Sequence, residues 1–328
     1  MFGKPEPLRL LFLEHVLRTS LPPVAWVVEH VVAEGERVLF FGEPATMKSW
    51  LLLHLGLHIA AGHKWLDFAV TAPRSVLYVD EEMTERLVRR RMQQLVAGGT
   101  PPAADGHFAV ASREGVLFNE RGGHTLLDQV WRADYKPEVV IIDSMRATLI
   151  GDENTQLDVI AFWRAVEPLL RAGLTIIVAH HMRKPRAEGP DAVRHRASGN
   201  TAIISGCDSA WAITRPGRAP AITVEAIKNR EVQEPPPFAV TFVSDGETGP
   251  VSVALGLTPE EASTGGQAVA IILDTLEQGE QTTGALEAAC EVEGVSRRTC
   301  YRTLESLETQ GRIAKVRHGV WALTTPCQ

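Results

Sequence analysis

The sequence of 328 residues has few cysteines and no excess of positive charge. Cys207, Cys290, Cys300 and Cys327 are scattered, without the spacing of a metal site or of a disulfide framework. The 33 Lys and Arg against 40 Asp and Glu give a formal net charge of −7. The chain as a whole therefore does not attract nucleic acid, and any such binding needs a local basic patch.

Long hydrophobic runs, signal peptides and internal repeats are also missing. The apolar stretch from Trp50 to Ala61 is too short to span a membrane and predicts a buried core helix. With 45% hydrophobic and 22% charged residues the composition is that of an ordinary globular chain. We expect a cytoplasmic protein without membrane contact, and its length favours two domains.

What the sequence does contain is a phosphate-binding loop between an apolar run, 37–41, and the apolar stretch that follows. The loop and the first helical residue after it are Gly42, Glu43, Pro44, Ala45, Thr46, Met47, Lys48, Ser49 and Trp50. Backbone N–H groups of such a loop face phosphate oxygens. Lys48 is expected to reach the β- and γ-phosphates and Ser49 to hold Mg²⁺. The alternative is a strand-turn-helix unit that binds nothing.

Met47 occupies the position where such loops usually have glycine. If this position needs a positive φ angle, methionine costs about 1–2 kcal/mol there. Nucleotide binding remains the better interpretation of the loop.

Apolar runs alternate with helical patterns from residue 36 to about 230, which is typical of βαβ units and a mostly parallel sheet. We therefore predict an α/β fold. Expected strands are 38–41, 75–79, 139–142, 175–179, 209–213 and 222–227, followed by a hairpin of 238–243 and 251–255. Expected helices are 84–96, 126–132 and 157–171.

A linker at 258–266 separates this domain, 1–257, from a small module at 267–328. Helices are expected at 268–278, 282–290 and 296–310, and a terminal hairpin at 312–316 and 320–323. Three helices and a hairpin predict a winged helix-turn-helix domain.

Acidic residues follow two of the predicted strands. Asp143 ends the run 139–142, at the sheet edge where ligands bind in α/β proteins, and is expected to hold Mg²⁺. Asp80, Glu81 and Glu82 end the run 75–79, and one of them is a candidate base for the attacking water. The alternative for these acids is a helix cap or a solvated turn.

His180 and His181 end the run 175–179, and Lys228 and Arg230 end the run 222–227. The histidines either hydrogen-bond a γ-phosphate and report it to the following loop, or are structural. The two cations either face solvent or reach the γ-phosphate of a neighbouring subunit.

Six motifs in this order carry a family resemblance: GEPATMKSWLLL, YVDEEMTERLVRRR, VVIIDSMRAT with GDEN, VAHHMRKP, ASGNTAI and IKNR. Over residues 22–245 the chain resembles the RecA-fold ATPases of the plasmid RepA-like hexameric helicase group. The resemblance implies a RecA-like core, Mg-ATP hydrolysis and a ring, usually of six subunits, with nucleotide between subunits.

The resemblance also implies roles for single residues. It makes Lys48 and Ser49 the P-loop pair, Glu82 the catalytic base, Asp143 the acid on the Mg²⁺ side, and His181, beside His180, the phosphate sensor. The family's arginine finger often directly precedes a Gly-Ser/Thr step. Ser198 has that place here, which leaves Arg196 and Arg230 as alternatives for the finger.

Two basic segments are candidates for DNA binding. The loop 182–199 contains Arg183, Lys184, Arg186, Arg194 and Arg196, which suit a single-stranded phosphate backbone, although such a run is often only a solvated face. The start of the third helix of the small module contains Arg297, Arg298, Tyr301 and Arg302, where winged helices contact duplex DNA. With six Lys and Arg against eight Asp and Glu, that module is equally suited to dimerisation or partner binding.

These expectations combine into one function: a ring-forming, Mg-ATP-hydrolysing motor or loader on DNA in mobile-element replication. Its expected partners are single-stranded DNA, duplex DNA at the winged helix, further copies in a homo-hexamer, and a primase or other replication protein. The alternatives are a DNA-bound regulatory ATPase switch without helicase activity, and a non-catalytic DNA-binding protein with a relict nucleotide site.

Overall fold

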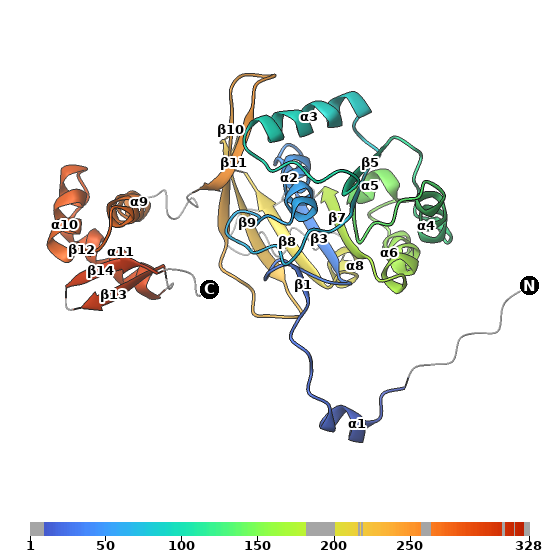
Figure 1. Cartoon of the computed structure of the whole chain (residues 1–328), viewed down its shortest axis with the longest axis horizontal. Helices are drawn as coiled ribbons and strands as arrows, with labels where there is room; N and C mark the ends of the chain where they lie inside the picture. Colours follow the sequence, from blue (N-terminus) through green and yellow to red (C-terminus); the bar gives the residue numbers. More distant parts are fainter. Residues whose placement is uncertain are drawn as a thin grey trace, which may run out of the picture.

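The computed structural model describes residues 10–181, 201–215, 217, 219–256, 264–309, 312–317 and 319–324. Its centre is a nine-stranded sheet in the order β11-β10-β9-β8-β3-β7-β6-β4-β5 (Figure 1). The strands are β3 (Arg37–Gly42), β4 (Val76–Asp80), β5 (Phe108–Ser112), β6 (Val139–Asp143), β7 (Thr175–His181), β8 (Ser209–Thr214), β9 (Ala221–Lys228), β10 (Phe238–Ser244) and β11 (Val251–Gly256).

The six strands from β8 to β5 across the sheet pair in parallel, and β9, β10 and β11 are antiparallel. Strands β4 and β6 are buried at every residue, because helices cover both faces of the sheet. The predicted α/β class with a mostly parallel sheet is confirmed.

Helices α2 (Lys48–Ala61) and α3 (Glu85–Ala97) cover one face, and α4 (Gly122–Arg132) and α6 (Gln156–Arg171) cover the other. The short helices α5 (Met145–Thr148) and α8 (Thr201–Ser205) contribute to the second face. Alternate residues of β3 divide between the two cores: Phe40 packs with α2, and Phe41 packs on the opposite side.

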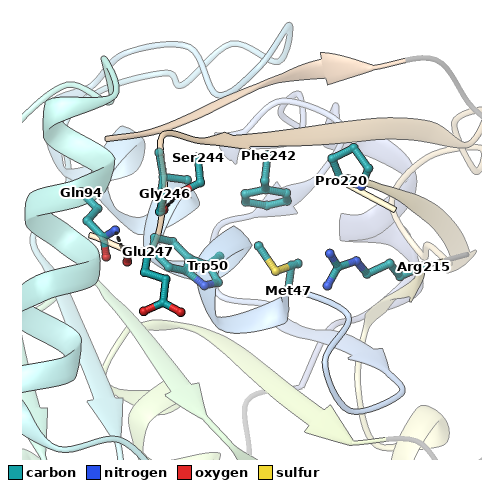
Figure 2. Close-up of a pocket in the computed structure, with 10 residues that line it drawn as sticks. Met47, Trp50, Gln94, Arg215, Pro220, Phe242, Ser244, Gly246 and Glu247 are labelled. Atoms are coloured by element: carbon teal, nitrogen blue, oxygen red, sulfur yellow. Dashed lines mark hydrogen bonds between the residues drawn. The ribbon is translucent and has the colours of Figure 1, made fainter. Parts of the chain in front are cut away.

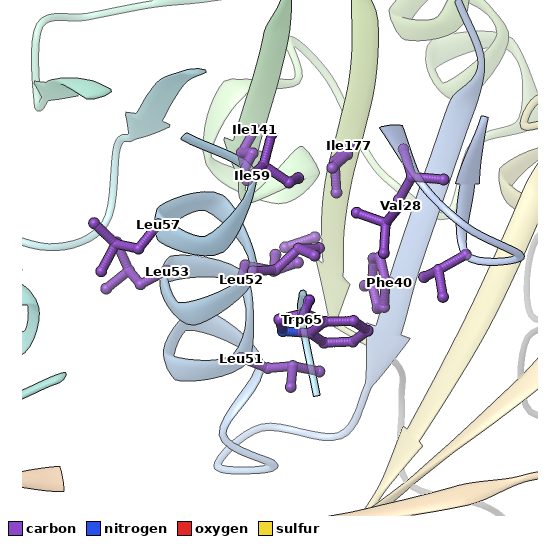
Figure 3. Close-up of a cluster of buried hydrophobic side chains, with 14 of the residues drawn as sticks. Val28, Phe40, Leu51, Leu52, Leu53, Leu57, Ile59, Trp65, Ile141 and Ile177 are labelled. Atoms are coloured by element: carbon purple, nitrogen blue, oxygen red, sulfur yellow. The ribbon is translucent and has the colours of Figure 1, made fainter. Parts of the chain in front are cut away.

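Helix α2 is the central helix of the first face, and apolar side chains surround it on nearly all sides. Leu51 and Leu52 lie beside Phe40 and Trp65 (Figure 3). A Cβ atom on Gly56 would come within 2.9 Å of side-chain atoms of Ile141, so glycine lets this helix approach the sheet closely. This packing fixes the helix that begins at the phosphate-binding loop.

Before the sheet, the chain forms α1 (Leu13–Arg18) and a small hairpin, β1 (Trp26–Val28) and β2 (Val32–Ala33). No residue of α1 is buried, and Figure 1 shows this helix apart from the sheet and its covering helices. The sequence patterns predicted neither element.

The C-terminal part contains α9 (Thr264–Glu277), β12 (Gln281–Thr282), α10 (Thr283–Val292), α11 (Arg297–Thr309), β13 (Ile313–Arg317) and β14 (Val320–Leu323). Its strands form an antiparallel sheet in the order β12-β14-β13 over a hydrophobic core of its own. Hydroxyl groups cap two of its helices: Thr282 accepts from the N–H of Ala285, and Ser296 accepts from the N–H of Thr299.

Most predicted elements lie within a few residues of the observed ones. Helix α9 begins at Thr264, inside the predicted linker 258–266, and the division into domains stays a prediction. Strand β5 was not predicted, because its residues are all half-buried and form only a short apolar run. No helix in the described part of the chain is long and apolar enough to cross a membrane.

Candidate functional site

The phosphate-binding loop connects β3 to α2 and contains two non-glycine residues in the left-handed region. Ala45 has φ 64° and Met47, at the N-cap of α2, has φ 63°. The condition on which the cost of methionine depended is therefore met, at about 1 kcal/mol or more for each residue. Gly42 is required for a different reason, since a Cβ atom there would lie 2.3 Å from the carbonyl oxygen of Ile213 on β8.

Lys48 is buried, and its ammonium group lies inside this loop. Its Nζ donates to the carbonyl oxygens of Gly42 at 2.8 Å and Glu43 at 2.7 Å, and to the hydroxyl of Thr46 at 3.2 Å. Burial lowers the pKa of Lys48 to about 8, and the negative charge of Asp143 does most to oppose this shift. The side chain is thus mostly charged at pH 7 and lies among acceptors.

Asp80 and Asp143 lie opposite one another at the carboxyl ends of β4 and β6. Asp143 is buried and accepts a 2.7 Å hydrogen bond from the hydroxyl of Tyr78. Asp80 accepts from the backbone N–H groups of Glu82 at 2.9 Å and Met83 at 2.7 Å, so it orders the turn after β4. Burial raises the pKa of Asp80 to about 6.

The two glutamates of this turn point to different partners. Glu81 accepts from the backbone N–H groups of Gly115 and Val116, which fixes a neighbouring loop. Glu82 accepts from the hydroxyl of Ser144 at 2.5 Å, and its carboxylate lies 3.4 Å from Nε2 of His181. The His181 hydrogen bond, followed by that of Ser144, lowers the pKa of Glu82 to about 2. Of the three acids after β4, Glu82 is the one that reaches the ends of β6 and β7.

The two histidines end β7, which is the neighbour of β3. His181 pairs in register with Gly42, and His180 pairs with Phe41. His180 is buried, with Nδ1 4.0 Å from the carboxylate of Glu153. Burial lowers the pKa of His180 to about 4, so this imidazole is neutral at pH 7.

Two arginines near the loop were missed by the sequence patterns. Arg215 follows β8, and its guanidinium donates to the carbonyl oxygens of Ala45 at 2.9 Å and Ala219 at 2.6 Å. The guanidinium of Arg91, on α3, lies 5.1 Å from the ring centroid of Trp50. A cation directly after a buried strand was the available signal for Arg215.

A cavity of about 330 Å³ lies beside the loop (Figure 2). The first turn of α2, the β10–β11 hairpin, α3 and the segment after β8 all contribute to it. Its lining residues are Met47, Trp50, Gln94, Arg215, Pro220, Phe242, Ser244, Gly246, Glu247 and Val251. Apolar rings, one guanidinium and one carboxylate therefore surround a space next to the phosphate-binding loop.

Lys228 and Arg230 lie at the opposite edge of the sheet. Lys228 pairs with Ala210 near the start of β8, whereas Gly42 pairs with Ile213 near its end, about 10 Å further along the strand. The Nζ atom of Lys228 donates to the carbonyl oxygens of Ile204 and Cys207, and Arg230 donates to Asp208 at 2.9 Å. The structure therefore does not bring these cations to the loop of their own subunit.

The remaining predicted site residues lie elsewhere. Arg183, Lys184, Arg186, Arg194, Arg196 and Ser198 lie outside the described residues, as do the side chains of Arg298 and Arg302 on α11. Arg297 is exposed, with Nε 3.1 Å from the carboxylate of Glu287 and its guanidinium 5.8 Å from the ring centroid of Tyr301.

The geometry above can now be compared with known proteins. The profile of the AAA_25 family, described as an AAA domain, matches residues 4–187, more than half of the chain. The chain belongs to the AAA_25 family. The loop between β3 and α2 is accordingly the P-loop of an AAA_25 domain, and its RecA-like α/β core agrees with the predicted fold class.

Two solved structures are similar in outline to this AAA_25 protein. The ATPase domain of a phage helicase has 11% identity and a TM-score of 0.46, over 66% of this chain and 84% of that one. The flagellar accessory protein FlaH from Methanocaldococcus jannaschii has 15% identity and a TM-score of 0.41, over 69% of this chain and 92% of that one. At these values neither likeness bears on function. No curated protein matches the chain.

Proposed function

We propose that this AAA_25 protein hydrolyses Mg-ATP at a site that a neighbouring subunit completes, and that it uses this hydrolysis to act on DNA. One observation carries the proposal. A buried lysine in a P-loop, a buried aspartate at the next strand end but one, and a glutamate in contact with a histidine converge at the carboxyl edge of one sheet.

The P-loop fits a triphosphate. Residues in the left-handed region at Ala45 and Met47 turn successive backbone N–H groups toward one side, which forms an anion-binding concavity at the start of α2. Lys48 now donates to loop oxygens that phosphate oxygens would replace. Its retained positive charge suits that exchange.

Ser49 and Asp143 fit a magnesium ion, because a hydroxyl and a carboxylate are the hard oxygen donors that Mg²⁺ prefers. When bound, Mg²⁺ neutralises charge on the β- and γ-phosphate oxygens. The hydroxyl of Tyr78 orients the Asp143 carboxylate through its 2.7 Å hydrogen bond. Ser49 begins the first turn of α2 directly after Lys48, where it faces the same phosphates.

Glu82 is assigned as the residue that orients and deprotonates the attacking water. Its neighbours Asp80 and Glu81 are occupied with backbone N–H groups, so neither is free to take this role in the observed arrangement. A pKa of about 2 makes Glu82 a weak base while it is bound to Ser144 and His181. Hydrolysis then requires Glu82 to leave at least one of these partners, and His181 is suited to couple that release to the γ-phosphate.

The cavity beside the P-loop is assigned to the nucleobase. Trp50 and Phe242 supply apolar rings, and Arg215 supplies a planar cation that can stack on a base. The cavity adjoins Met47, so a triphosphate in the loop and a base in the cavity belong to one nucleotide.

Lys228 and Arg230 are assigned to the site of a neighbouring subunit. They lie at the edge of the sheet opposite to their own P-loop, so contact with a γ-phosphate requires head-to-tail packing of subunits. Such packing closes into a ring when the rotation between subunits closes, and a homo-hexamer is the expected ring. Arg196 remains the alternative finger.

The action on DNA rests on the basic segment 182–199, through Arg183, Lys184 and Arg186, and on the C-terminal module. The order helix, strand, helix, helix and hairpin supports a winged helix, in which α11 with Arg297, Arg298 and Arg302 would meet duplex DNA. We retain 1–257, 258–266 and 267–328 as ATPase domain, linker and winged-helix domain. A helicase, a loader and a regulatory switch share these features.

The test is ATP hydrolysis with and without single-stranded DNA, followed by strand displacement on a forked duplex. Hydrolysis that DNA stimulates supports the proposal, and strand displacement identifies a helicase rather than a regulatory switch. A purified wild-type protein that binds DNA but never hydrolyses ATP would show the nucleotide site to be a relict.

A further inference from the structure

The N-terminal segment of residues 10–21, called the arm below, exposes large apolar side chains. Six of them are 61–90% exposed: Leu10, Leu11, Phe12, Leu13, Leu17 and Leu21. Helix α1 within the arm has six residues, none of them buried. A helix of this length is not stable alone in water, and monomeric proteins seldom expose so many neighbouring apolar side chains. The arm therefore needs a surface to cover it.

The body of the protein has a matching surface. Leu117 is 46% exposed, Ile150 is 49% exposed and Leu157 is 74% exposed. A backbone bridge joins the segments before and after these residues, because Phe118 pairs with Leu149. The carboxylate of Asp158 accepts from the N–H of Asp152 at 2.9 Å, which brings the start of α6 to the same place. Leu117, Ile150 and Leu157 are called the apolar patch below.

The arm and the apolar patch belong to opposite edges of the sheet. The arm joins the body at Ala25, whose carbonyl accepts from the N–H of Glu34 at 2.8 Å, just before β3 begins. The patch follows Val116, whose N–H is held by Glu81 directly after β4 ends. Strand β3 alone spans about 20 Å between these edges, at about 3.3 Å a residue. The arm thus starts at the edge with Lys228 and Arg230, and the patch lies at the edge with the P-loop.

We propose that the arm of one copy packs on the apolar patch of the next copy in a head-to-tail assembly. The inference rests on the proposed function only for the direction of packing: the edge with Arg230 faces the edge with the P-loop, and the same approach brings arm to patch. The seven residues 19–25 can extend about 25 Å from the body. Arg18 of the arm is matched by Glu114 and Glu120, exposed acids on either side of Leu117. The occupant of the patch is therefore a second copy of this chain.

Cross-linking between differently tagged copies tests the contact. One copy carries Leu17→Cys and the other Leu157→Cys, both with Cys327→Ser, because Cys207, Cys290 and Cys300 are buried. Mild oxidation of the mixture with copper-phenanthroline should give a disulfide-linked pair of unequal chains. The matched control replaces Leu157→Cys by Val243→Cys, a residue of β10 that is 60% exposed, and should give at least about fivefold less product.

A single chain that carries both Leu17→Cys and Leu157→Cys separates the two possible origins of the covering surface. Linked ladders of chains support contact between copies. A fast-migrating monomer with an internal disulfide, or equal linking in the Val243→Cys control, overturns the proposal. Neither readout uses nucleotide turnover.

Assembly without cross-linking gives an independent readout. Leu13→Ser with Leu17→Ser changes only exposed positions, so the fold should persist, and native mass should shift toward monomer. Val243→Ser should leave the mass unchanged. Sedimentation with phosphatidylcholine–phosphatidylserine vesicles tests a lipid surface as the rival: vesicle binding lost in the arm variant, with assembly unchanged, overturns the proposal. If cross-linking fails while ATPase activity still rises with protein concentration, the arm inference fails alone. If cross-linking succeeds without any ATP hydrolysis, the proposed function fails alone.

Discussion

The carboxylate of Glu82 lies 3.4 Å from Nε2 of His181, although the two residues end different strands. His181 pairs in register with Gly42, the first residue of the P-loop. The acid assigned to water activation and the first glycine of the phosphate site are therefore connected through one imidazole. A change at the phosphate can reach Glu82 without any movement of the sheet.

This contact leads to a prediction for Glu82→Gln. The variant should bind ATP normally, because Glu82 is not assigned to the nucleotide, and hydrolyse it at least ~10²-fold more slowly, as expected for the loss of a general base. Equilibrium binding and single-turnover hydrolysis measure the two effects. Glu81→Gln is the matched control and should lose less, since Glu81 holds a loop. Normal hydrolysis by Glu82→Gln would move the base to another acid.

Met47→Gly should change ATP affinity by less than about tenfold, or 1.4 kcal/mol. Met47 already has the left-handed conformation without nucleotide, so binding need not create that strain. Met47→Ala keeps the strain and removes the side chain from the cavity, which separates packing from backbone effects. Isothermal titration measures both. A hundredfold gain in affinity for the glycine variant would show that the natural loop resists the bound state.

Phe242→Ala should weaken binding of ATP by about tenfold and leave binding of inorganic tripolyphosphate unchanged. The reason is that Phe242 lines the assigned base cavity and no phosphate site. Lys48→Ala, the control, should weaken both ligands, because it removes a phosphate contact. Equal losses for both ligands with Phe242→Ala would place the base elsewhere.

Stability should fall in mild acid, partly through His54. This buried imidazole accepts from the indole N–H of Trp65 and contacts His58, and burial lowers its pKa to about 3. The unfolded chain, with a histidine pKa of about 6.5, binds more protons below that pH. The contribution of His54 is therefore complete above pH 6.5 and is lost as the pH falls toward 3, by about 2 kcal/mol at pH 5.

Urea unfolding at pH 7.5 and pH 5 measures this contribution. His54→Gln should reduce the difference between the two pH values, whereas His63→Gln, at an exposed position, should leave it unchanged. His180, with a pKa of about 4, acts in the same direction in all variants. Asp80, with a pKa of about 6, opposes it, since its contribution is lost as the pH rises through that value. An unchanged difference in His54→Gln would contradict the role of burial at His54.

Some parts of this site follow from the sequence and others do not. Asp80, Asp143 and His181 lie at strand ends as predicted, because polar residues after continuous apolar runs must emerge at one edge of a parallel sheet. The distance between Arg230 and the P-loop depends on β9 running antiparallel to β8, and an apolar run does not specify its direction. The contact of Arg215 with Ala45 depends on a loop conformation that no periodicity encodes. Helix α1 is short, and none of its residues is buried within the described part of the subunit, so no core-facing pattern marks it.

The central claim is that one subunit supplies the P-loop and its neighbour supplies Arg230. Lys48→Ala and Arg230→Ala should each abolish nearly all ATP hydrolysis when assayed alone. In a mixture, the intact P-loop of an Arg230→Ala subunit meets the intact Arg230 of a Lys48→Ala subunit at some interfaces. The account predicts that mixing two inactive proteins restores part of the wild-type activity. Mixtures that assemble, as shown by native mass, yet remain as inactive as their components would contradict it.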